Sequence, residues 1–129
     1  MIDIKHKGEH EKMIVYQSIC ELSKIVQDIL MCIPKTEYKM RSQIINANDS
    51  IASNFVEGYY SGYINEYLRF LTYSRRSGAE LYERIKRVRQ MKYIGENIYN
   101  LFEDRILKTM YLIDRTRQGL ENSIMRKQS

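Results

Sequence analysis

The chain has 129 residues and a formal net charge of +5, with one proline, six glycines and two cysteines. A chain of this length buries roughly two thirds of its unfolded surface in one core, so we expect a single domain over residues 1–129. The scarcity of helix breakers and cysteines argues against an all-β fold and a disulfide scaffold. No apolar run approaches the ~18 residues of a membrane span. We therefore expect a cytoplasmic protein without a membrane partner.

The first predicted helix covers residues 9–32, where apolar side chains recur at steps of three and four residues. Pro34 ends this helix, because its ring removes a backbone donor and restricts Ile33. Thr36 is the predicted N-cap of the second helix, residues 36–57. Gly58 is the predicted stop of that helix.

The third predicted helix covers residues 65–92, begins at Asn65 or Ser61, and places Ser74 and Gly78 on its apolar seam. These small residues predict a close approach by a neighbouring helix. Gly95 separates this helix from a fourth over residues 96–125, and residues 126–129 are expected to fray. Four long helices with short connections predict an all-α, antiparallel up-down-up-down four-helix bundle.

The candidates for catalytic chemistry are few. His6 and His10 are four residues apart, but Lys7 stands where the zinc-protease motif requires glutamate. The glycines are isolated, so the sequence contains no phosphate-binding loop. We expect no enzyme activity, no catalytic residue, no metal site and no cofactor.

Positive charge is concentrated in one segment: residues 60–95 carry eight basic and three acidic side chains. Helical projection places one basic row beside the apolar seam, and no carboxylate lies in that row. Such a row with interleaved tyrosines suits phosphate contact and base stacking, although the tyrosines could instead pack against another helix or subunit. The predicted nucleic-acid-binding residues are Arg75, Tyr82, Lys86, Arg89, Lys92 and Tyr93.

Four tyrosines crowd the turn between the second and third helices: Tyr59, Tyr60, Tyr63 and Tyr67. Tyrosine is favoured in interfaces because it buries an apolar ring and keeps a polar tip. We therefore interpret these residues as an interface between subunits or as a well-packed end of the bundle.

Several motifs resemble the four-helix-bundle proteins encoded in 23S ribosomal RNA intervening sequences, a superfamily that includes the accessory variability determinant (Avd) proteins of diversity-generating retroelements. The most specific motif contains Ser50, Asn54, Glu57 and Gly58. The other matching segments are Ile33-Pro34-Lys35-Thr36-Glu37, Ser42-Gln43, Glu66-Tyr67-Leu68-Arg69-Phe70-Leu71 and Ala79-Glu80-Leu81.

The resemblance implies a homo-oligomeric ring, usually of five subunits, without known catalytic activity. Avd members resemble basic partners of a reverse transcriptase that bind nucleic acid, RNA or DNA. For the signature residues we expect structural roles: Ser50 and Asn54 bond across the bundle, and Glu57 reaches the start of the next helix.

The chain departs from many ribosomal-type members, which have arginines in place of Ile45 and Asn46 and a Gly-Ser pair in place of Arg76-Ser77. We expect a nucleic-acid-binding bundle that acts as an Avd-like accessory subunit of a reverse transcriptase. The alternatives are an intervening-sequence protein of unknown role and a scaffold that docks an acidic protein.

Overall fold

The computed structural model describes residues 8–128, and within this range the ordered elements are all helical. The short 3-10 helix η2 precedes four α-helices, as the sequence predicts for an all-α bundle. The elements are η2 (Glu9–Lys12), α1 (Ile14–Cys32), α2 (Tyr38–Tyr59), α3 (Ile64–Gln90) and α4 (Glu96–Gln128).

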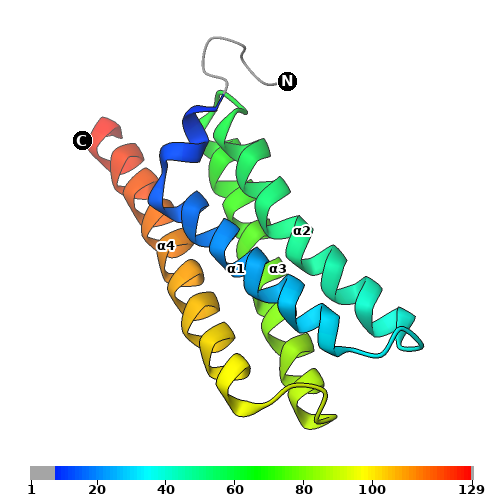
Figure 1. The fold of residues 1–129 in the computed structure, drawn as a ribbon. Helices are drawn as coiled ribbons and strands as arrows, with labels where there is room; N and C mark the ends of the chain where they lie inside the picture. Colours follow the sequence, from blue (N-terminus) through cyan, green and yellow to red (C-terminus); the bar gives the residue numbers. More distant parts are fainter. Residues whose placement is uncertain (1–7, 129) are drawn as a thin grey trace.

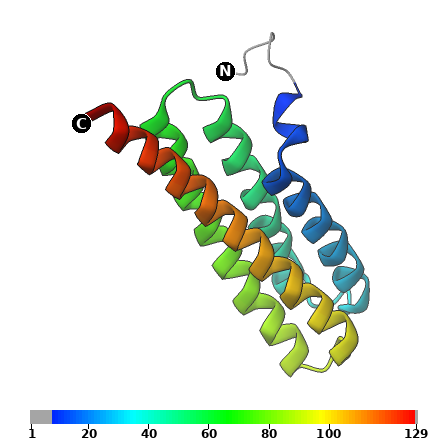
Figure 2. The ribbon, with the colours of Figure 1, turned by 90° about the vertical axis from the view of Figure 1, so that its left-hand side faces the viewer.

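The two ends of the bundle hold different connections (Figure 1). The α1–α2 and α3–α4 connections lie at one end, where the Tyr93 hydroxyl donates a hydrogen bond to Glu37 over 3.2 Å. The α2–α3 connection, η2 and the C-terminal turns of α4 lie at the other end, and Figure 2 shows the same placement from the side. There the Tyr60 hydroxyl and His10 Nδ1 are hydrogen-bonded at 2.8 Å.

The core is built from branched aliphatic and aromatic side chains of all four α-helices, including Leu22, Ile51, Leu81 and Phe102. Helix α2 packs along α3, while α4 packs along α1 and α3. None of the helices in residues 8–128 combines the length and the apolar composition needed to cross a membrane.

The buried serine and threonine hydroxyl groups of this core are paired. Ser18 of α1 and Thr109 of α4 share a hydrogen bond of 2.7 Å. Ser74 of α3 donates to the Ile51 carbonyl oxygen of α2, also over 2.7 Å. These bonds satisfy polar groups that would be costly to bury alone, and each one fixes the register of two packed helices.

Gly58 does not end α2, contrary to the sequence-based prediction. It is buried within the helix, and a Cβ atom there would lie 2.8 Å from Phe70 Cβ and 3.3 Å from the Tyr67 carbonyl oxygen of α3. The glycine thus allows the close approach of two helices. The turn that follows depends instead on Gly62, whose φ of 86° lies in the left-handed region.

The predicted helix starts are also corrected. Glu37, not Thr36, is the N-cap of α2, and Tyr63, not Ser61 or Asn65, is the N-cap of α3; neither makes a side-chain capping bond. The extended backbone of Met13 separates η2 from α1, so residues 9–32 do not form one helix.

The C-terminal prediction was too short, because α4 continues to Gln128. In contrast, the small-residue seam of α3 is confirmed: a Cβ atom at Gly78 would lie 3.3 Å from Met110 Cγ of α4. The sequence therefore identified where α4 approaches closely, although not where α4 ends.

Candidate nucleic-acid interface

The predicted basic row of α3 faces α4, and carboxylates of α4 pair with it. Arg75 Nε donates to Asp114 over 2.8 Å. The Arg89 guanidinium donates two hydrogen bonds to Glu96, of 3.0 and 2.8 Å. All four side chains are roughly half exposed, so these ion pairs are screened by water and contribute little stability individually. These ion pairs nevertheless engage guanidinium groups that the sequence analysis predicted to be unpaired.

A hydrogen-bonded network of α3 and α4 holds the tyrosine of this row. The Glu103 carboxylate accepts hydrogen bonds from the Tyr82 hydroxyl over 2.6 Å and from the Tyr99 hydroxyl over 3.2 Å. The bond from Tyr82 lowers the pKa of Glu103, and the same bond raises the pKa of Tyr82 to about 12. Tyr82 is thereby directed towards α4.

Two cations of the row lie against these phenol rings. Lys86 Nζ lies 4.4 Å from the centre of the Tyr82 ring and 3.2 Å from a Glu83 oxygen. The Arg89 guanidinium carbon lies 4.3 Å from the centre of the Tyr99 ring. Such cation–π contacts orient the cations but do not neutralise them.

The expectation that this row is unneutralised is therefore corrected: carboxylates of α4 pair with Arg75 and Arg89, and Glu83 of α3 pairs with Lys86. Sequence reasoning missed Glu96, Glu103 and Asp114 because α4 was not projected with α3. Their separations of 7 and 11 residues place them on one helical face, a signal that the sequence contains.

The last two predicted residues, Lys92 and Tyr93, lie in the α3–α4 connection. Lys92 is exposed in the left-handed region, with φ of 62°, and no carboxylate in residues 8–128 pairs with it. Tyr93 is half-buried and donates to Glu37. Lys92 therefore remains available to a ligand. Tyr93 instead links the α3–α4 connection to the α1–α2 connection through its hydrogen bond to Glu37.

The free cations of α3 lie on its outer face. Arg76 and Arg87 are exposed, and neither forms an ion pair with any residue of the described chain. The guanidinium carbons of Arg69 and Arg76 each lie 5.9 Å from the centre of the Tyr73 ring. Arg69 also pairs with Glu66 over 2.7 Å. Two arginines of this face, Arg76 and Arg87, are therefore left unpaired within the described chain.

Polar side chains join α2 to this face of α3. Ser77 Oγ of α3 donates to Ser50 Oγ of α2 over 2.8 Å, and the Asn54 amide donates to Ser50 Oγ over 2.9 Å. Arg84 donates to the Gln43 side chain over 2.9 Å. The expectation for the signature is corrected in part, because Ser50 bonds across the bundle while Asn54 bonds within α2.

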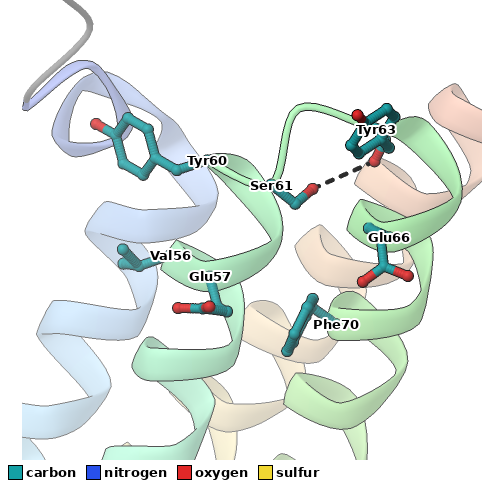
Figure 3. A pocket seen from close by; sticks show the side chains of 7 residues that line it. All are labelled: Val56, Glu57, Tyr60, Ser61, Tyr63, Glu66 and Phe70. Carbon is teal, nitrogen blue, oxygen red and sulfur yellow. Dashed lines mark hydrogen bonds between the residues drawn. The ribbon is translucent and has the colours of Figure 1, made fainter. Parts of the chain in front are cut away.

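Glu57 of the signature motif lines a hollow between α2 and α3 (Figure 3). Glu57 of α2 and Glu66 and Phe70 of α3 line it from facing sides. Ser61 donates to the Gly58 carbonyl oxygen over 2.8 Å, which closes the turn above the hollow. Glu57 forms no hydrogen bond or ion pair with residues 8–128, contrary to the expectation that it reaches the next helix.

The four tyrosines near this turn differ in burial. Tyr59, Tyr60 and Tyr67 are part-buried at the end of the bundle, and the Tyr59 ring centre lies 4.9 Å from that of Tyr60 and 6.0 Å from that of Tyr67. Burial raises the pKa of Tyr67, whose enclosed hydroxyl has no hydrogen-bond partner among residues 8–128. Tyr63 is 74% exposed. Three tyrosines therefore pack within the chain, and Tyr63 is accessible to a second molecule.

Metal ligation has no candidate in the part of the chain that the structure describes: no group of three or more His, Cys, Asp and Glu side chains is suitably placed. Of the two histidines, His6 lies outside the described residues, and His10 contacts the rings of Tyr16 and Tyr60. The expectation that His6 binds no metal therefore stays a prediction.

Comparison with known proteins supports the motif-based resemblance. A search of curated proteins gives no match to the chain. The model of the 23S rRNA-intervening sequence protein family matches residues 11–115, which span α1, α2, α3 and most of α4. By the extent of this match, the chain belongs to the 23S rRNA-intervening sequence protein family.

Proposed function

We propose that this chain forms a homo-oligomeric ring of antiparallel four-helix bundles that binds nucleic acid and catalyses no reaction. The observation that carries the proposal is the charge of α3. This helix has seven basic and three acidic side chains, and Arg76 and Arg87 on its outer face have no carboxylate partner in residues 8–128. Unpaired, exposed arginines attract phosphates, and a ring repeats each contact around its axis.

Fluorescence anisotropy with labelled single-stranded RNA and DNA tests this function. We expect binding at low salt to at least one of the two. If each subunit contacts about three phosphates, the salt slope is about −2, so a fourfold rise in salt lowers the affinity about 16-fold. Absence of binding to both strands at low salt, or affinity that does not change with salt, would contradict the proposal.

A more specific form of the proposal makes the bundle an Avd-like accessory subunit of a reverse transcriptase. Its support is the position of the basic charge on α3, where Arg76-Ser77 replaces the Gly-Ser pair of many ribosomal-type relatives. Purification of the tagged chain from its native cells tests it. A nuclease-resistant complex with a reverse transcriptase supports the accessory role, and recovery of the bundle without one contradicts it.

A further inference from the structure

We infer that nucleic acid lies along the α2–α3 face, defined by Asn46, Ser50, Tyr73, Arg76, Ser77 and Arg87, and not along the predicted basic row between α3 and α4. This inference rests on the proposed function and specifies its site. The two faces lie on opposite sides of the apolar seam of α3. They differ in whether their cations have carboxylate partners.

The first argument is the availability of charge. Arg76 and Arg87 are exposed and unpaired within residues 8–128. They are eleven residues apart, which is three helical turns, so they lie on one side of α3 about 16 Å apart. That distance matches about five stacked nucleotides at 3.4 Å per step. One strand passing along α3 can therefore meet both guanidiniums.

The second argument is preorganisation. The Arg76 guanidinium lies against the Tyr73 ring, on which the Arg69 guanidinium also lies, and the Phe70 ring meets Tyr73 edge-on with 5.8 Å between their centres. A guanidinium restrained by an aromatic ring loses less conformational entropy when it binds a phosphate. Arg76 is thus oriented before a strand arrives.

The third argument is the neutral chemistry beside these arginines. Serine and asparagine side chains commonly contact phosphate and sugar oxygens. Ser50 and Ser77 already join α2 to α3 by a hydrogen bond of 2.8 Å, and Asn46 is exposed two turns from the Asn54 amide. The face combines cations with uncharged donors. Its two exposed carboxylates, Glu80 and Glu83, lie between Arg76 and Arg87 and are paired with Arg84 and Lys86.

The row between α3 and α4 is less suited to the same ligand. A phosphate that binds Arg75 or Arg89 must displace Asp114 or Glu96 or approach those carboxylates closely. Both courses reduce the electrostatic gain. The partners that hold this row to α4 therefore make it the weaker site.

The acidic hollow near the α2–α3 turn limits the face at one end. Glu57 is exposed and unpaired within the described residues, and it repels phosphate. Glu66 is offset by Arg69. We therefore expect a bound strand to follow the Arg76–Arg87 part of α3 and to avoid the turn.

Two matched double variants test the site by anisotropy with the same labelled RNA and DNA. Arg76→Gln with Arg87→Gln and Arg75→Gln with Arg89→Gln both remove two positive charges from α3. We expect the first pair to lower affinity at least tenfold at low salt and to reduce the salt slope by about 1.4, because two phosphate contacts are lost from a single strand. The second pair should change affinity less than threefold.

The outcomes separate the inference from the function on which it depends. If wild-type protein does not bind, the proposed function fails. If wild-type protein binds and the second pair weakens binding as much as or more than the first, the α2–α3 site is wrong. Circular dichroism and light scattering of both variants establish that folding and assembly are retained. Glu57→Gln provides an independent test. The affinity for nucleic acid should rise, and an unchanged affinity would contradict the prediction that Glu57 limits the bound strand at the α2–α3 turn.

Discussion

At the residue scale, Gly58 shows how one missing side chain sets the spacing of two helices. A Cβ atom there would lie 2.8 Å from Phe70 Cβ and 3.2 Å from Tyr67 Cδ1. We expect Gly58→Ala to lower the free energy of unfolding by about 1–3 kcal/mol, because overpacking outweighs the better helix propensity of alanine.

Gly119→Ala is the matched control, since Gly119 also lies within a helix but a Cβ atom there has no neighbour within 4 Å. This change should raise the free energy of unfolding by up to about 1 kcal/mol. Urea unfolding of both variants measures the difference. If both substitutions change the free energy of unfolding equally, helix propensity and not the contact with α3 determines the effect of Gly58→Ala.

The Tyr82–Glu103 hydrogen bond predicts an alkaline loss of stability. The unfolded chain loses the proton of Tyr82 near pH 10, whereas the folded chain keeps it to about 12. The free energy of unfolding therefore falls progressively as the pH rises through this interval. The stabilising contribution of the Tyr82–Glu103 hydrogen bond is fully present below pH 10. The pKa of Glu103 is lowered, so its contribution is present above the ordinary glutamate pKa and is lost in more acidic solution.

Urea unfolding at about pH 9 and about pH 11 measures this effect. Tyr82→Phe should lose less stability over this interval than the control Tyr111→Phe, which removes an exposed tyrosine without a hydrogen-bond partner in the described chain. The same alkaline loss in both variants would show that the bond to Glu103 does not shift the pKa of Tyr82.

At the scale of elements, Arg41 of α2 caps the C-terminus of α1. Its guanidinium donates to the carbonyl oxygens of Leu30 and Ile33. The last carbonyls of a helix lack partners within the helix and favour a cation, and Pro34 excludes another turn. We expect Arg41→Ala to lower the free energy of unfolding by about 1–2 kcal/mol.

Lys39→Ala serves as the control for Arg41→Ala, because it removes the same charge from the exposed start of α2. Chemical denaturation of the two variants should place the larger loss at Arg41. If Lys39→Ala is equally destabilising, the effect belongs to net charge and not to the cap.

The elements also show what periodicity predicts and what it misses. Apolar spacing predicted the four helices and the seam at Ser74 and Gly78, because burial repeats with the helical turn. Glycine and capping rules misplaced the ends at Thr36 and Gly58, and at Gly58 the contact with α3 overrode the local preference. The pairing of Arg89 with Glu96 was missed for the same reason: it depends on two helices, and each helix was read alone.

At the scale of the whole molecule, the predicted ring is testable by light scattering. We expect a particle mass near five times the 15.5 kDa of one chain. Tyr63 is exposed in the single chain, and Tyr63→Asp should reduce the particle mass if this end of the bundle forms the interface, because a carboxylate is costly to bury.

Tyr38→Asp is the control for assembly. Tyr38 is similarly exposed but lies at the start of α2, at the other end of the bundle. A wild-type particle of 15.5 kDa would contradict the ring. Dissociation by Tyr38→Asp alone would place the interface at the end opposite to the four tyrosines.

The pairing of α2 with α3 and of α1 with α4 has a consequence for the order of folding. Residues 60–63 connect α2 to α3, so this pair can form after closing a short loop, whereas the Ser18–Thr109 bond joins residues 91 positions apart. The entropy of loop closure grows with the length of the loop. We therefore expect the α2–α3 hairpin to form early, and the docking of the first helix onto the last to complete folding.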